Sequence, residues 1–132
     1  MSCALGHVDM MFHAFCFLGY PIGLEKAAQG MRLRGKPIGM SGLLAPKLWA
    51  EGHFKEVLEY VAQDVRTAIE IAQVCEQRRR LDWITSKGRL NSMPLTKGWL
   101  TVKEAMLLPK PDTSWMSAAI PRQDFTAWLA AN

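Results

Sequence analysis

Cysteine is scarce in this chain, and the number of cysteines is odd. Only Cys3, Cys16 and Cys75 occur among 132 residues. Small secreted domains that are stapled by disulfides typically carry an even and denser set. The cysteine content therefore predicts a protein of a reducing compartment, and we expect a cytoplasmic location.

Long apolar runs are also lacking. The longest, near Met10 to Leu18, is interrupted by His13 and has about half the length that a bilayer-spanning helix needs. No basic stretch precedes this run, as a signal peptide would require. We expect neither a membrane span nor a signal peptide.

Positively charged residues only slightly outnumber negatively charged ones. The formal net charge is +4, with 21% charged and 49% hydrophobic residues. These values are ordinary for a folded soluble chain of one-domain length and exclude disorder of the whole chain. The small positive surplus is compatible with a nucleic acid or an acidic partner but does not establish either.

The strongest pattern in the sequence predicts a long helix over residues 54–79. Arg78, Arg79 and Arg80 stand at its C-terminal end, where cations favour the exposed carbonyl groups, so this basic triplet requires no nucleic acid. Nine apolar residues recur at helical spacing and form one stripe. The stripe consists of Phe54, Val57, Leu58, Val61, Val65, Ala68, Ile69, Ala72 and Cys75.

Weaker patterns predict short elements on either side of this helix. Residues 4–11 read as a short buried strand or an extended lead-in, and 12–18 as a helix. A short helix is expected over 24–31, and 81–88 begins a turn-rich segment.

Two further helices are expected near the C-terminus. Thr101 and Glu104 have the spacing of a capping box before a short helix that Pro109 ends. Pro121 suits the first turn of a final helix. That helix is expected to bury Phe125, Trp128 and Leu129.

A basic loop over residues 32–42 separates the short helix at 24–31 from the long one. It contains three glycines and a proline, together with the cations Arg32, Arg34 and Lys36. A solvated connection explains this composition, and so does a flexible loop that contacts a phosphate backbone. The three cations are therefore candidate nucleic-acid-binding residues.

Tyr60 and Asp64 are the candidate catalytic residues of the long helix. Because they are four residues apart, they lie one turn apart on the same face, at the border of the apolar stripe. A carboxylate at such an edge can bind a divalent cation, and a neighbouring phenol can orient a water molecule. On spacing alone, a surface aspartate beside a boundary tyrosine is the better explanation, because Tyr-x-x-x-Asp occurs by chance in many helices.

The stretch from Asp9 to Gly88 resembles the later half of the exonuclease domain in DEDD-type 3′–5′ exonucleases of the Tyr subclass. Among these it is most similar to stand-alone enzymes related to the proofreading domain of family B DNA polymerases. The similar residues are His7-Val8-Asp9-Met10, Gly23-Leu24-Glu25-Lys26-Ala27-Ala28, the loop Gly35-Lys36-Pro37 with Gly39 and Gly42, Glu59-Tyr60-Val61-Ala62-Gln63-Asp64-Val65-Arg66-Thr67, and Trp83-Ile84-Thr85.

The resemblance implies a fold and a chemistry. The fold is the C-terminal half of an RNase H-like α/β fold, and we expect a mostly α chain with little strand. In the family, four acidic residues hold two metal ions that promote attack of water on a terminal phosphodiester. The resemblance makes Asp64 the last metal ligand, for Mg²⁺ or Mn²⁺, and makes Tyr60 the residue that positions the water.

The chain departs from the family where the first two acidic motifs should stand. No Asp-x-Glu strand and no Asn-containing second motif are present, and Asp9 corresponds to the strand after that motif. We therefore expect a truncated exonuclease-like protein that is not catalytic alone and acts through protein or nucleic-acid binding. The alternatives are part of an active DNA exonuclease and a phage-type inhibitor or adaptor of a nucleic-acid-processing complex.

The missing strands also affect the expected organisation. Residues 1–90 are predicted to form the exonuclease-like subdomain, and 91–132 a C-terminal extension packed on it. Without the early strands the apolar stripe of the long helix has less to cover it. We expect a protein partner or a homo-oligomer, with DNA as a further partner and no membrane association.

Two other groups of residues have the composition of a possible site. Cys3, His7, His13 and Cys16 have spacings that a zinc site could use, but the intervening residues are apolar and favour a buried core. In the C-terminal region, lysines are scattered among tryptophans that could stack on single-stranded bases, although core packing with solvated lysines is the better explanation. These residues are Trp99, Trp115, Trp128, Lys97, Lys103 and Lys110.

Overall fold

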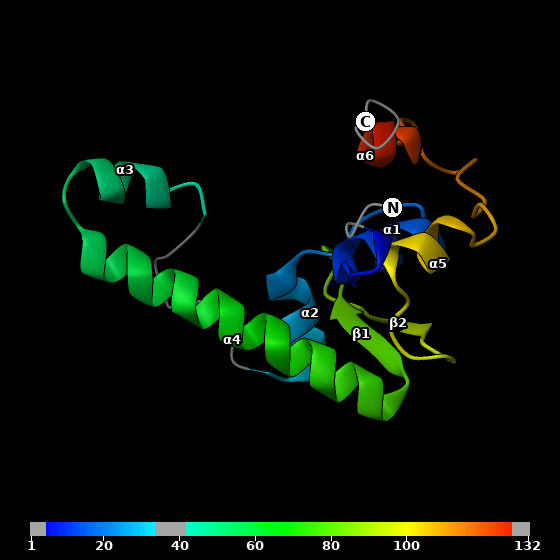
Figure 1. Cartoon of the computed structure of the whole chain (residues 1–132), viewed down its shortest axis with the longest axis horizontal. Helices are drawn as coiled ribbons and strands as arrows, with labels where there is room; N and C mark the ends of the chain where they lie inside the picture. The colour runs from blue at the N-terminus through cyan, green and yellow to red at the C-terminus, as the bar shows by residue number, and fades with distance from the viewer. Residues whose placement is uncertain (1–4, 34–41, 128–132) are drawn as a thin grey trace. The chain divides into compact units, whose positions relative to one another are not determined.

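The computed structural model describes residues 5–33 and 42–127 (Figure 1). Its contacts divide the chain into two compact units, one of residues 1–22 with 99–132 and one of residues 23–98. The described part is mostly helical, and its strands form a two-stranded antiparallel sheet. The expectation of a mostly α chain with little strand is confirmed, whereas the predicted domain boundary at residue 90 stays a prediction.

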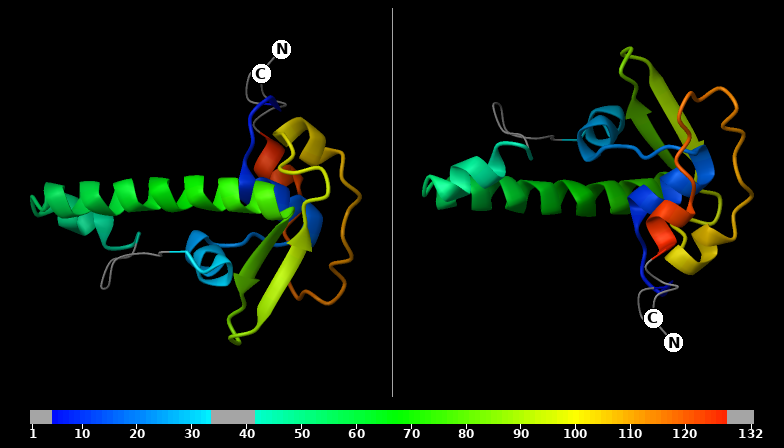
Figure 2. Two further views of the ribbon diagram at one scale, coloured as in Figure 1. Left: turned by 90° about the horizontal axis from the view of Figure 1, so that it is seen from below. Right: turned by 90° about the horizontal axis from the view of Figure 1, so that it is seen from above.

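The unit of residues 23–98 is built around one long helix. It contains α2 (Leu24–Met31), α3 (Ala45–Ala50) and α4 (Phe54–Arg78), followed by β1 (Arg80–Ile84) and β2 (Leu90–Pro94). Helix α4 confirms the helix expected over residues 54–79, and α2 has the bounds that its apolar spacing predicted. Both views of Figure 2 place α2 and the β1–β2 hairpin on the same side of α4.

The chain reverses direction immediately after α4. Arg79 takes the left-handed conformation with φ 58°, and its N–H donates to the carbonyl of Cys75 at 2.8 Å. Such a cap ends a helix and satisfies one of its last carbonyls. Strand β1 therefore starts at the next residue, and its register with β2 runs from Arg80↔Pro94 to Ile84↔Leu90.

The hairpin corrects the expected turn-rich segment. Residues 81–84 belong to β1, and the turn lies only at the end of the segment, around Gly88, which has φ 77°. Leu81, Asp82 and Trp83 are consecutive buried residues, so this strand lacks the polar–apolar alternation that marks a half-exposed strand. Its pattern is that of a strand covered on both faces.

Helix α2 packs directly on β1. Gly30 lies so close to the strand that a Cβ atom there would overlap the backbone of Trp83. The neighbouring Met31 is 1% exposed, and its sulfur accepts a hydrogen bond from the N–H of Asp82 at 3.2 Å. A residue without a side chain is thus required where helix and strand meet.

In the other unit, the described residues form the short helices α1 (Met10–Leu18), α5 (Val102–Met106) and α6 (Gln123–Thr126). The start of α1 is fixed by Asp9, whose carboxylate accepts the N–H of Phe12 at 3.0 Å. This N-cap explains why a helix starts at Met10. Of the two interpretations of residues 4–11, the buried strand is wrong for the described residues 5–11, whereas Asp9 is extended as a lead-in would be. The helix expected over 12–18 is confirmed.

The remaining helix predictions are met in part. The capping box of Thr101 and Glu104 is present at the start of α5, and this helix ends at Met106, before Pro109. Helix α6 follows Pro121 as expected, but its Phe125 is 38% exposed. Trp128 and Leu129 lie outside the described residues.

Arg122 joins separate parts of this unit. Its guanidinium donates to the carbonyls of Cys16 and Leu108 at 2.7 Å each, and to those of Pro109 at 3.1 Å and Met106 at 3.3 Å. A planar fork of five donors suits such a set of acceptors. The core beneath it contains Phe12, Phe15, Cys16, Val102 and Ala105.

Replacing Gly30 with alanine tests the close approach of α2 to β1. The added methyl group has no room beside the backbone of Trp83, so we expect Gly30→Ala to lower the free energy of unfolding by about 1–3 kcal/mol. Urea denaturation followed by circular dichroism measures this loss. The matched control is Gln29→Ala at the neighbouring exposed position, which should change stability by less than about 0.5 kcal/mol. Equal losses in both variants would contradict the packing described.

Candidate functional site

Tyr60 and Asp64 lie one turn apart on α4, as their spacing predicted. Tyr60 is 6% exposed, and Asp64 is half-buried. They belong to the side of α4 that is covered within its own unit, which we call the inner face. The inner face comprises Val57, Tyr60, Thr67, Ile71 and Cys75.

The phenol of Tyr60 reaches the turn that precedes α3. A Cβ atom on Gly42 would lie 3.6 Å from the Tyr60 hydroxyl oxygen. Further along, Gln63 donates from Nε2 to the hydroxyl of Thr67 at 3.1 Å. Burial of this kind fixes the tyrosine side chain, and its role in orienting a water molecule stays a prediction.

The donor set around Asp64 does not fit a two-metal site within the described residues. Across residues 5–33 and 42–127, no group of three or more His, Cys, Asp or Glu side chains is placed to hold a metal ion. A two-metal centre needs several carboxylates that hold both ions together. The role of Asp64 as a ligand of Mg²⁺ or Mn²⁺ therefore stays a prediction that depends on groups from elsewhere.

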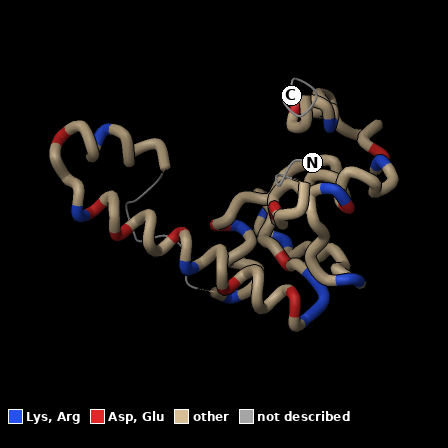
Figure 3. Tube along the Cα trace, viewed as in Figure 1, with Lys and Arg blue, Asp and Glu red and all other residues tan. Residues whose placement is uncertain are grey.

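The predicted nucleic-acid-binding cations can be located only in part. Arg32 is exposed and caps α2 in the left-handed conformation, with φ 59°. Arg34 and Lys36 lie outside the described residues. Elsewhere in the same unit, Figure 3 shows basic residues where α4 turns into β1. Two of these cations have acidic partners, since Arg79 pairs with Glu76 and Arg80 with Asp82.

His13 is a core residue. His13 is only 3% exposed, and its Nδ1 accepts a hydrogen bond from the N–H of Leu100 at 3.2 Å. The ring meets Trp99 edge-on, with 5.5 Å between centroids. Burial lowers the pKa of His13 below 6.5, and the carboxylate of Glu104 offsets this in part. A neutral imidazole that accepts a backbone hydrogen bond follows from this geometry.

The cysteines near His13 give no support to a zinc site. Cys16 is fully buried, and burial raises the pKa of its thiol, with Arg122 acting in the opposite direction. His7 is exposed, and Cys3 lies outside the described residues. A thiol held protonated by burial is a poor metal ligand.

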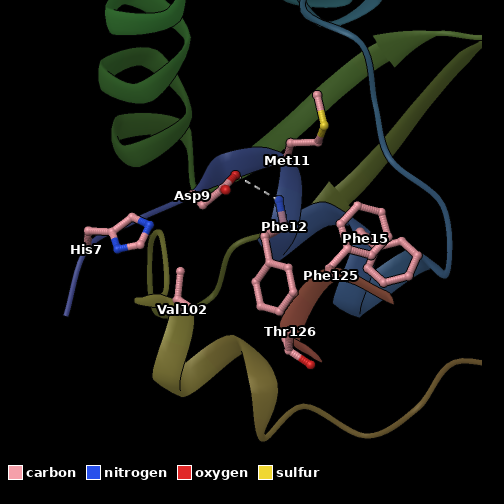
Figure 4. A pocket seen from close by; sticks show the side chains of 8 residues that line it. All are labelled: His7, Asp9, Met11, Phe12, Phe15, Val102, Phe125 and Thr126. Carbon is pink, nitrogen blue, oxygen red and sulfur yellow. Dashed lines mark hydrogen bonds between the residues drawn. The ribbon is translucent and has the colours of Figure 1, made fainter. Parts of the chain in front are cut away.

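A small cavity lies beside α1 (Figure 4). Its volume is about 130 Å³, and its wall is mainly aromatic and aliphatic, including Phe12, Phe15 and Phe125. Figure 4 shows His7, Asp9 and Thr126 among the polar groups that line it. Because Asp9 is engaged as the N-cap of α1, the cavity lacks a set of converging polar groups that would define a ligand.

A further apolar surface lies on α4. This second apolar side, which we call the outer face, lies next to the inner face around the helix and remains about half exposed. The outer face comprises Phe54 (49% exposed), Leu58 (59%), Val61 (48%), Val65 (53%) and Ile69 (52%). Contiguous exposed apolar surface of this kind marks interaction sites.

Covering the outer face would be favourable. Fully burying one such side chain stabilises by about 1.5–3 kcal/mol, so burying the exposed half contributes on the order of 1 kcal/mol for each residue. Helix α3 adds to this surface at one end, because Trp49 stacks edge-on against Phe54 with 4.5 Å between centroids and is itself 50% exposed. The sequence showed one apolar stripe, and its division into a covered and an open face was missed.

Comparison with known proteins adds no relative. No protein-family model, no curated protein and no solved structure matches the chain. Among the described helices, none combines the length and apolar character needed to cross a membrane.

The buried imidazole of His13 predicts a pH dependence of stability. Its pKa is lowered in the folded state, so the unfolded chain takes up a proton first as the pH falls below 6.5. The stabilisation that the neutral His13 contributes is fully present above pH 6.5. It is lost as the pH falls toward the lowered pKa of His13 in the folded state. We expect the difference in unfolding free energy between about pH 8 and about pH 5 to shrink in His13→Gln, which keeps an acceptor but does not titrate.

Urea denaturation at the two pH values measures this difference. His7→Gln provides the control, because His7 is exposed and should leave the pH dependence as in the unchanged chain. If His13→Gln and His7→Gln behave alike, His13 is not the neutral acceptor described.

Proposed function

We propose that this chain is a truncated 3′–5′ exonuclease-like protein that acts by binding and does not cleave nucleic acid alone. The observation that carries the proposal is the outer face of α4, where five large apolar side chains are about half exposed. A helix face of this size exposed to water indicates a surface that another polypeptide covers. The proposed location is the cytoplasm.

The proposed kinship with RNase H-like exonucleases depends on residues of the inner face and of α2. Tyr60 and Asp64 share one face of a long helix, which is what the third acidic motif of the family requires. The segment that resembles the family before the glycine-rich loop forms α2, and Trp83 with Ile84 belongs to β1. These features support the later half of an RNase H-like fold.

The proposal that the isolated chain is not catalytic depends on its carboxylates. Asp64 is the one residue of the chain that the family resemblance makes a metal ligand. The described residues provide no acidic cluster around it. In the alternative, the chain is part of an active enzyme whose other carboxylates come from another segment or copy. A phage-type inhibitor or adaptor of a nucleic-acid-processing complex would use the same outer face for docking.

Degradation of single-stranded DNA labelled at its 3′ end separates these alternatives. The purified chain and its Asp64→Ala variant are incubated with the DNA and with Mg²⁺ or Mn²⁺, beside an active 3′–5′ exonuclease. We expect no release of label by either form of the chain, because one carboxylate cannot hold two ions. Release by the unchanged chain that is lost in Asp64→Ala would overturn the proposal and favour the active enzyme.

A further inference from the structure

The positive charge of the chain is concentrated in the β1–β2 hairpin and at its two ends. Residues 76–97 contain six lysine and arginine residues and two acidic residues, which gives this stretch a formal net charge of +4. The whole chain also has a net charge of +4, so the remaining residues are neutral in total. All six cations of the stretch are exposed, and they are Arg78, Arg79, Arg80, Lys87, Arg89 and Lys97.

These cations lie at the two ends of a projecting ribbon. Figure 2 shows the hairpin extending away from α4, with the turn between its strands at the far end. Lys87 and Arg89 belong to this far end, which we call the tip. Lys97 follows β2 at the near end, which we call the base. There the N–H of Leu95 donates to the carbonyl of Arg79 at 2.9 Å.

The C-terminus of α4 does not account for this distribution. A helix C-terminus favours cations within its last turn, and Arg78 lies in that turn. Lys87 and Arg89 lie at the opposite end of the hairpin, well outside it. The charge at the tip therefore requires another explanation.

The two acidic residues of the stretch are already engaged. Glu76 pairs with Arg79 at 3.5 Å. Asp82 is 5% exposed and accepts hydrogen bonds from Arg80, at 3.1 Å, and from Ser92. The excess positive charge of the stretch consequently belongs to the other four cations, Arg78 and Lys97 at the base and Lys87 and Arg89 at the tip.

We propose that the β1–β2 hairpin binds the phosphate backbone of double-stranded DNA. This inference rests on the proposed function, since it names a ligand for a chain that acts by binding. It uses a surface other than the outer face of α4. Arg78, where the hairpin begins, is about 20 Å along the helix axis from Asp64, so this surface is also separate from the residue predicted to bind metal.

The length of the hairpin fits a groove of B-form DNA. The strand ladder continues past Ile84, because the N–H of Thr85 donates to the carbonyl of Arg89 at 2.8 Å. Five steps along the strand separate Arg80 from this pair, a distance of about 17 Å. The major groove is about 12 Å wide and admits a two-stranded β-ribbon. Cations at the base and at the tip can therefore contact phosphates on both sides of the groove.

Double-stranded DNA fits this surface better than other nucleic acids do. Proteins that bind single strands stack the bases on aromatic side chains. Between residues 76 and 97, all of which the structure describes, the one aromatic residue is Trp83, and it is 3% exposed. The major groove of an RNA duplex is too deep and narrow for side chains to enter. Contacts to phosphates make the binding independent of base sequence.

Fluorescence anisotropy with a labelled short DNA duplex of mixed sequence tests the proposal. Each phosphate that a cation neutralises contributes about −0.9 to the slope of log K against log salt concentration. With four cations at the base and the tip, we expect binding at low salt and a slope of about −4.

Removal of the two cations at the tip tests the location. Lys87→Gln combined with Arg89→Gln should weaken binding by more than about tenfold and make the slope shallower by about 2. The matched control is Lys47→Gln combined with Lys55→Gln. It removes the same charge from exposed positions at the opposite end of α4 and should leave the slope unchanged. Circular dichroism verifies that both variants fold.

The outcomes separate this inference from the proposed function. Absence of binding at low salt, or an equal loss in the two double variants, overturns the role of the hairpin. Tighter binding to the single strand, to an RNA duplex of the same sequence or to phosphatidylserine vesicles overturns the choice of double-stranded DNA. None of these results bears on catalysis, which the assay with 3′-labelled DNA and Asp64→Ala decides by itself.

Discussion

The structure of residues 23–98 depends on how much of one long helix its own neighbours can cover. Helix α4 has 25 residues, and α2 and the β1–β2 hairpin lie on one side of it (Figure 2). They bury Ile71 and Cys75 to 2% and 0% exposure, whereas Val65 and Ile69 remain about half exposed. A short helix and a two-stranded hairpin cannot cover both apolar sides of such a helix. The open outer face is a consequence of this shortage.

The close contact of α2 with β1 makes the covered side possible. Gly30 allows the helix to reach the backbone of Trp83, and Met31 accepts a hydrogen bond from the strand beside it. Polar contacts within the hairpin stabilise it. Asp82 is buried and accepts hydrogen bonds from Arg80 and from Ser92 on β2. A buried carboxylate with two donors is satisfied and needs no metal or ligand to explain it. The inner face, which includes Tyr60, is thus covered by elements of its own unit.

The sequence predicted the elements whose signals are local. Helix α4 followed from its 3.6-residue spacing, and α5 from the capping box of Thr101 and Glu104. Strand β1 was missed because residues on both of its faces are buried, which removes the alternation, and Asp9 was read within a strand although it caps α1. Division of the apolar stripe into two faces could not be predicted, since it depends on which elements pack against α4.

The inner face of α4 belongs to the fold, whereas the outer face contributes little to it. Urea denaturation of Ile71→Ala and Val65→Ala tests this difference most directly. We expect Ile71→Ala, at a position 2% exposed, to lower the free energy of unfolding by about 2–5 kcal/mol. Val65→Ala, at a position 53% exposed, should lower it by less than about 1 kcal/mol. Equal losses in the two variants would contradict the division of α4 into a covered and an open face.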